Sequence, residues 1–307
     1  MKNITYFFLA IFCIFSNRLF AQDTAENYFN SGSEKGAAGD FKGAINDFTQ
    51  AIRLNPKYAE AFYSRAVAER YIGDYNASIS DNSKAIQLKQ DYPEAFLNRG
   101  FSKSLLLDHK AAIADYNKAI QLNPDFTIAY YDRALSKYSI GDTNGAALDL
   151  DKAIKLDNKY SEAYYSRALI YFQLNNFKTS IEYYSNAIKY NPNYTDAYYN
   201  RGLAKFSLLD YNGAKKDFDV VIQKDATHSK AFYFRGTVNF SLKQFDKALY
   251  DSNQAIKLDP KYAQAYWQRG IIFITALNEE KKGCEDLQHA KNLGYLKATE
   301  TIQEFCK

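Results

Sequence analysis

Residues 44–52 read Ala-Ile-Asn-Asp-Phe-Thr-Gln-Ala-Ile, with two Ala-Ile pairs seven residues apart. Close variants of this stretch begin again at residues 78, 112, 146, 180 and 248. Neighbouring copies are separated by 34 residues or by twice that number. Because self-similarity at one fixed spacing is the signature of a repeat protein, this period decides the fold.

Each repeat unit contains two helical stretches. Seven units of 34 residues run without insertion from Ala25 to Tyr262, and an eighth begins at Ala263. Within a unit, apolar and small residues recur every three or four positions, which is typical of amphipathic helices. Gly39, Gly73 and Gly141 separate the two stretches in their units, where a left-handed residue can end a helix. The sequence therefore predicts a helix-turn-helix in every unit.

The composition is consistent with a helical chain, and the net charge does not indicate any class of binding partner. The 307 residues include 47% apolar side chains but only 14 glycines and 5 prolines, too few for a strand-rich sandwich or barrel. Lys and Arg exceed Asp and Glu by 39 to 35, a net charge of +4 that gives no reason to expect nucleic acid or anionic lipid.

The pattern of aromatic and small residues resembles that of the tetratricopeptide repeat family. In the first unit the matching residues are Tyr28, Gly32, Ala44, Phe48, Ala51 and Pro56, and in the third they are Phe96, Gly100, Ala112, Tyr116, Ala119 and Pro124. The resemblance implies an all-α fold, a right-handed α-solenoid (superhelix) of helix-turn-helix units over residues 22–294 with a C-terminal capping helix at 295–307. The units start at residues 25, 59, 93, 127, 161, 195, 229 and 263.

The first 21 residues have the pattern of an export signal. Lys2 precedes an apolar run over residues 4–15, and Ala21 offers a small residue for cleavage. We expect the mature protein to be periplasmic or secreted, with no transmembrane span after signal removal. An uncleaved anchor is the alternative.

Two cysteines remain in the expected mature chain, Cys284 and Cys306. They are equidistant from Tyr295, so an antiparallel helical hairpin that turns there would place them opposite each other. We predict a disulfide between them, since export leads to an oxidising compartment. The alternative is two free thiols.

A row of arginines occupies one position of the first helix in seven units: Arg65, Arg99, Arg133, Arg167, Arg201, Arg235 and Arg269. Aspartates recur at one position of the second helix: Asp47, Asp81, Asp115, Asp149, Asp217 and Asp251. We predict that each aspartate pairs with the arginine of the following unit, which would leave Arg201 without an acid because Tyr183 stands in that place. Nucleic-acid binding by the arginines is the alternative.

Two aromatic rows mark the candidate binding surface. The family resemblance implies that first helices line a concave face, on which these side chains would lie. Row one comprises Tyr131, Tyr165, Tyr199, Tyr233 and Trp267, and row two comprises Tyr138, Phe172, Phe206 and Phe240. Rows at this spacing also fit a helix that is buried on two faces, so they are either groove or core. As a groove, their large area suits an extended peptide or a partner helix.

No residue pattern indicates an enzyme, a cofactor or a metal site. His109, His228 and His289 lie in different units, and we expect them to be solvated bystanders. We therefore expect a noncatalytic protein-protein interaction scaffold in the cell envelope or extracellular space, with a protein or peptide partner and no nucleic acid. The alternative is a glycan or small-ligand binding protein that uses the same aromatic groove.

Overall fold

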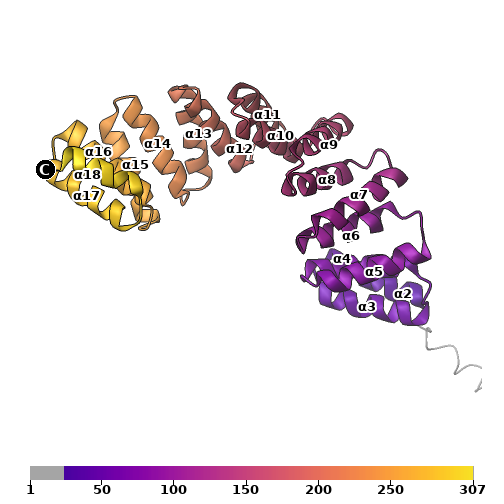
Figure 1. Ribbon diagram of the computed structural model, residues 1–307. Coiled ribbons are helices and arrows are strands. Elements are labelled where there is room, and N and C mark those ends of the chain that lie inside the picture. The colour runs from indigo at the N-terminus through magenta and orange to yellow at the C-terminus, as the bar shows by residue number, and fades with distance from the viewer. Residues whose placement is uncertain (1–23, 307) are drawn as a thin grey trace, which may run out of the picture. The chain divides into compact units, whose positions relative to one another are not determined.

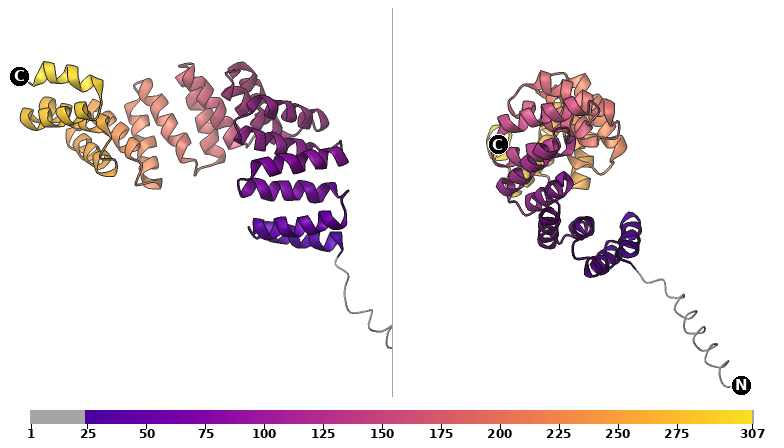
Figure 2. Two further views of the ribbon diagram at one scale, coloured as in Figure 1. Left: turned by 60° about the horizontal axis from the view of Figure 1, so that its bottom comes forward. Right: turned by 90° about the vertical axis from the view of Figure 1, so that its right-hand side faces the viewer.

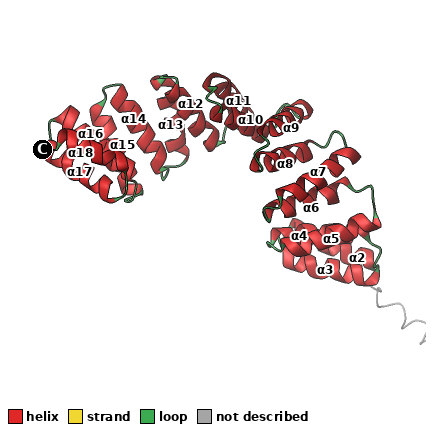
Figure 3. Ribbon diagram, in the orientation of Figure 1, coloured by secondary structure: helices red, strands yellow, loops and turns green. Residues whose placement is uncertain are grey.

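The computed structural model describes residues 24–306, and in this range it is all helical (Figures 1 and 3). The predicted signal peptide lies outside the described residues. The described chain forms two compact units, residues 24–146 and 147–306, which we treat separately. Within each unit the structure is a stack of helical repeats, an α-solenoid. No described helix is both long enough and apolar enough to cross a bilayer.

In the first unit the helices are α2 (Ala25–Ala37), α3 (Phe41–Leu54), α4 (Ala59–Tyr71), α5 (Tyr75–Leu88), α6 (Pro93–Leu105), α7 (His109–Leu122) and α8 (Thr127–Ser139). Helix α9 (Thr143–Leu156) contains the division between the units. The helices of the second unit are α10 (Ser161–Gln173), α11 (Phe177–Tyr190), α12 (Thr195–Ser207), α13 (Tyr211–Lys224), α14 (Ser229–Ser241), α15 (Phe245–Leu258), α16 (Ala263–Leu277), α17 (Glu280–Asn292) and α18 (Leu296–Phe305). Successive helices of a unit pack side by side (Figure 2).

The turns inside several hairpins follow from two local features, and at the other turns a non-glycine residue such as Leu107 or Asn175 has the positive φ. Gly39, Gly73 and Gly141 have φ between 84° and 86°, as predicted for left-handed caps. An acid or amide then begins the second helix: the Asp40 carboxylate, for example, accepts a hydrogen bond from the Gly43 N–H at 2.9 Å. These caps fix the hairpins at the predicted spacing.

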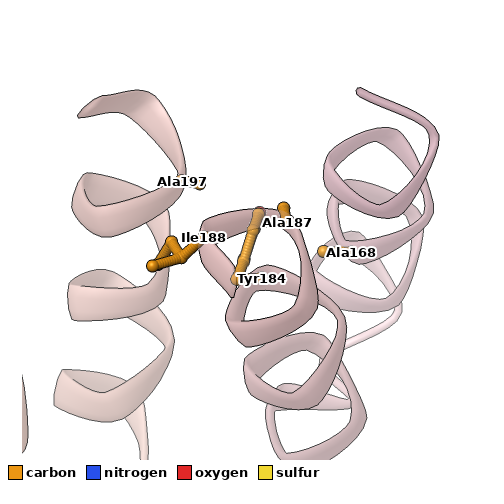
Figure 4. Close-up of a cluster of buried hydrophobic side chains, with 5 residues drawn as sticks. All are labelled: Ala168, Tyr184, Ala187, Ile188 and Ala197. Atoms are coloured by element: carbon orange, nitrogen blue, oxygen red, sulfur yellow. The ribbon is translucent and has the colours of Figure 1, made fainter. Parts of the chain in front are cut away.

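Small residues allow the two helices of a hairpin to approach closely. A Cβ added to Gly100 would lie 2.8 Å from the Tyr116 ring, and one added to Gly202 would lie 2.8 Å from Phe218. The next hairpin is joined through clusters such as Ala168, Tyr184, Ala187, Ile188 and Ala197, drawn from α10, α11 and α12 (Figure 4). The core of each unit is therefore continuous along its stack.

The predicted pairing of the arginine row is wrong. Four aspartates of the row, Asp81, Asp115, Asp217 and Asp251, pair with the arginine of their own hairpin, because the two helices of one hairpin lie against each other at this point. Asp47, whose hairpin has Ser31 in place of the arginine, accepts a hydrogen bond from Ser31 Oγ at 2.6 Å and pairs with Lys35. Arg201, expected to lack an acid, binds both oxygens of Asp217 at 2.9 and 2.7 Å. The exception is Arg167, whose own hairpin has Tyr183 there, and it bonds Asp151 of the preceding repeat at 2.9 Å. Pairing within one hairpin, as for Arg201 and Asp217, also joins Arg65 to Asp81, Arg99 to Asp115, Arg235 to Asp251 and Arg269 to Asp286.

The same arginines also reach the preceding hairpin. In the first unit the Arg99 Nη1 donates to Ser83 Oγ at 3.0 Å, and in the second the Arg235 Nη1 donates to Asp219 Oδ1 at 2.7 Å. The same bond joins Arg65 to Thr49, Arg133 to Asn117, Arg201 to Ser185 and Arg269 to Asn253. The forked guanidinium thus holds an acid of its own hairpin and, in addition, an oxygen of the previous one.

The C-terminus has the predicted helical hairpin, with α18 packed against α17. The Cys284 and Cys306 sulfur atoms are 2.01 Å apart and the Cα atoms 5.8 Å apart, which is disulfide geometry. Trp267 Nε1 donates to Thr301 Oγ1 at 2.9 Å, and the Lys297 ammonium lies 4.8 Å from the centre of the Trp267 ring. Helix α18 therefore covers Trp267.

Candidate functional site

The nine aromatic residues of the predicted surface are all half-buried. In the second unit, row-one rings pack against the aromatic or histidine ring that closes the same repeat. The Tyr165 and Tyr194 centroids are 4.7 Å apart, and those of Tyr233 and Tyr262 are 5.1 Å apart. Tyr199 lies 4.9 Å from the His228 ring. Row one therefore contributes to the junction between hairpins as well as to the surface.

Row two packs within its own hairpin. Phe172 meets Phe177 edge-on at 5.3 Å, and Phe240 meets Phe245 in the same way at 5.5 Å. Each partner is the first residue of the second helix. Each of these rings therefore has one face in the packing and part of its area accessible.

Polar groups beside row one connect successive hairpins of the second unit. Asn200 Nδ2 donates to the Tyr165 hydroxyl at 2.9 Å, and Gln268 Nε2 donates to Thr237 Oγ1 at 2.7 Å. Burial raises the pKa of Tyr199 to about 12, with a smaller contribution from Tyr233. The Tyr199 hydroxyl therefore stays protonated and can donate a hydrogen bond at neutral pH.

A hollow in the first unit was not predicted. It has a volume of about 290 Å³ and lies on the first-helix face between α2 and α4. Phe48 lines it, and the rings of Phe41 and Tyr71 stack beside it at 4.5 Å. Gly36 also lines it, at the repeat position that row two fills with rings in later units. Comparing that position across the repeats would have revealed the missing side chain.

The three histidines make specific contacts, while His289 is exposed and His109 and His228 are half-buried. His228 caps α14, because its Nδ1 accepts a hydrogen bond from the Ala231 N–H at 3.1 Å. The His289 ring lies 4.2 Å from Tyr266, and the His109 Nδ1 is 3.4 Å from a serine hydroxyl. Across residues 24–306, no three or more His, Cys, Asp or Glu side chains gather as a metal ion would require.

Known proteins share both the sequence pattern and the fold. A family model described as TPR repeat matches residues 32–69, 168–208 and 236–274, and one described as tetratricopeptide repeat matches residues 93–126. An uncharacterised protein of Methanocaldococcus jannaschii is 44% identical over 46 residues, which is 15% of this chain. The match spans about half of that relative, 54% of its length.

Two crystal structures are similar in fold. The MamA protein is 26% identical with a TM-score of 0.50, and the match covers 55% of this chain and 92% of MamA. YrrB, described as a TPR protein with an unusual peptide-binding site, is 23% identical with a TM-score of 0.54 over 60% of this chain and 95% of YrrB. With the repeat period, the hairpins and the matching family models together, the chain belongs to the tetratricopeptide repeat family.

Proposed function

We propose that the protein is a noncatalytic scaffold that binds an extended peptide or a partner helix on the first-helix face of its repeats. Family membership supports a protein-interaction role, and YrrB provides an example of a peptide-binding protein with this fold. The proposed site of action is the cell envelope or the extracellular space, because residues 1–21 have the pattern of an export signal.

The hollow beside Gly36 is the observation that carries this proposal. Its aromatic walls and its volume of about 290 Å³ suit one large apolar side chain of a bound peptide. It shares the repeat register of the aromatic rows: Tyr63 takes the position of row one and Gly36 that of row two. A peptide anchored in the hollow would therefore run along this face of the first unit.

In the second unit, row-one hydroxyls would add polar contacts to a peptide that binds the first-helix face of that unit. Tyr199 and Tyr233 keep their protons, since burial raises the pKa of both side chains. A tyrosine that is half-buried by its neighbours loses little conformational freedom on binding, so its exposed edge can contribute to affinity.

Filling the hollow tests the proposal. A Cβ added to Gly36 has only Ala44 within 4 Å, at 3.8 Å, so Gly36→Ala fits and Gly36→Phe would occupy the space. Peptides selected from a display library on the wild-type protein should bind Gly36→Ala unchanged. Their affinity for Gly36→Phe should fall by about tenfold or more. Equal binding by all three proteins would reject the hollow as the anchor, and failure to select any peptide would reject peptide binding.

A further inference from the structure

Arg70 on α4 places a positive charge next to the hollow of the first unit. It comes 34 residues after Gly36, so it occupies the row-two position of the following repeat. Its Cζ lies 4.7 Å from the centre of the Tyr71 ring, and Tyr71 lines the hollow. Burial and Glu94 raise the pKa of Tyr63, another residue of the lining, while the charge of Arg70 lowers it. The charge of Arg70 therefore acts on the wall of the hollow.

The protein holds this guanidinium group in one orientation. The Arg70 Nε donates a hydrogen bond to Asn98 Oδ1 at 2.8 Å, which ties it to α6, the first helix of the next hairpin (Figure 1). The rings of Tyr71 and Phe101 pack against the group, with their centres 4.7 and 4.9 Å from Cζ. A side chain that is fixed in this way loses little conformational freedom when it binds a ligand.

The two Nη atoms of Arg70 have no partner within the protein. Among the described residues, Arg70 forms no ion pair, and neither Nη atom donates a hydrogen bond. The side chain is half-buried, but neither Nη atom is among the polar atoms that are closed off from solvent. A ligand can therefore reach both atoms. Two adjacent N–H groups of a guanidinium match the two oxygen atoms of a carboxylate.

One acid of the protein opposes a ligand carboxylate at this place, but only in part. Burial raises the pKa of Asp132 on α8 to about 7, although the charge of Arg70 lowers it. Near pH 7 about half of the Asp132 side chains are therefore neutral, which weakens their repulsion of an incoming carboxylate.

We propose that the peptide bound in the hollow carries an aspartate or glutamate within two residues of its large apolar side chain, and that the Nη atoms of Arg70 bind this carboxylate. Alternate side chains of an extended peptide lie on one side, about 7 Å apart. Tyr71 contacts both the hollow and the guanidinium, so this short spacing brings the acid to Arg70. The inference rests on the proposed function, and it names the class of peptide that the first unit takes.

A pair of matched peptides tests the proposal. The tightest peptide selected on the wild-type protein from a random display library would be synthesised with an acetylated N-terminus and an amidated C-terminus, which excludes a terminal carboxylate as the ligand. In its twin, Asn or Gln replaces each acidic residue. By calorimetric titration at pH 7, the full-length wild type should bind the acidic peptide about tenfold more tightly than the twin. Arg70→Gln should remove this preference by weakening only the acidic peptide.

Two variants serve as controls. Arg53→Gln, which removes an exposed positive charge from α3, should bind both peptides as the wild type does. Gly36→Phe should weaken both peptides, because it fills the hollow itself.

Three results would overturn the inference while the hollow remained a peptide site. These are selected peptides that lack an acid near the apolar residue, equal wild-type affinity for the two twins, or a preference that persists in Arg70→Gln. The comparison of the twins on the wild-type protein does not depend on how well Arg70→Gln folds. Failure to select any peptide would instead reject the proposed function, and this inference with it.

Discussion

In the first unit, one buried carboxyl group, that of Glu69, destabilises the fold when it ionises. Glu69 on α4 is 9% exposed, and its Oε2 has no hydrogen-bond partner among the described residues. Burial raises the pKa of Glu69 to about 8, and the nearby Asp81 adds to this, while Arg65 opposes it. Since the folded-state pKa is above the unfolded value, ionising Glu69 destabilises the fold. The penalty is absent below about pH 4.5 and grows until the pH reaches about 8.

Glu69→Gln should therefore stabilise the protein at high pH. We expect a gain on the order of 2 kcal/mol at pH 9 and almost none at pH 4, because the neutral amide has no charge to desolvate. Urea unfolding of variant and wild type at both pH values measures the difference. Glu34→Gln, at an exposed position of α2, is the control. A gain that is equal at both pH values would contradict the assignment.

Arg99 is a second residue whose role can be tested alone. Arg99→Lys keeps the charge but loses the two-point contact with Asp115 and the bond to Ser83. We expect a loss of about 1–2 kcal/mol in unfolding free energy by urea titration. Arg53→Lys, at an exposed arginine of α3, should change it by less than about 0.5 kcal/mol. Equal losses of unfolding free energy in Arg99→Lys and Arg53→Lys would show that the two-point contact of Arg99 does not stabilise the fold.

The pairing predicted for the arginines was wrong because sequence spacing alone does not distinguish the two possible partners. Arg65 is 18 residues after Asp47 and 16 before Asp81, so both pairings were compatible with the repeat. The register of two facing helices decides between them, and periodicity does not contain that register. The accessibility of row one was uncertain for a related reason, because Tyr194, His228 and Tyr262 cover it from the end of each repeat.

At the scale of helices, packing is sensitive to single methyl groups. Gly100→Ala should destabilise the protein by about 1–3 kcal/mol, because its Cβ would lie 2.8 Å from Tyr116 and 3.2 Å from the Ala112 carbonyl oxygen. Gly36→Ala should be neutral or stabilising, since nothing crowds that position. Thermal melts followed by circular dichroism compare the two. If Gly100→Ala melted at or above the wild-type temperature, the close approach would not be required.

The fluorescence emission of Trp267 can report whether helix α18 is docked. Trp267 is the single tryptophan of the sequence, and α18 covers it through Thr301 and Lys297. Reducing the predicted Cys284–Cys306 disulfide should cost on the order of 3 kcal/mol, which weakens the docking of α18. We expect the Trp267 emission to shift to longer wavelength on reduction.

The Cys284→Ser, Cys306→Ser double variant supplies the control, because reductant should leave its emission unchanged. Two reactive thiols in the exported protein before any reduction would contradict the disulfide. An unchanged emission after complete reduction would show that α18 stays docked without it.

For the whole molecule, the 34-residue period gave the architecture almost completely. The capping helix, expected within residues 295–307, extends from Leu296 to Phe305. The hollow beside Gly36 could not be predicted in the same way. It depends on which side chain is missing at one place and on how Phe41 and Tyr71 stack around the gap.

Export is the prediction that belongs to the complete chain. Cleavage after Ala21 would leave Gln22 as the first residue and would remove Lys2 and Arg18. Expression in a bacterial host, followed by intact-mass measurement of the periplasmic fraction, should yield the chain that begins at Gln22. Recovery of only the uncleaved protein, in the membrane fraction, would favour the anchor instead.

The hydrogen bond from each arginine to the preceding hairpin permits the number of repeats to change. The arginine Nη1 donates a hydrogen bond to a side-chain oxygen of the preceding hairpin, and that oxygen differs from repeat to repeat: Thr49, Ser83, Asn117, Ser185, Asp219 or Asn253. Excising residues 195–228 would bring Arg235 to Ser185 in place of Asp219. Gene duplication or deletion in steps of one whole hairpin would therefore recreate a compatible contact between hairpins, so the number of repeats can change without loss of this hydrogen bond.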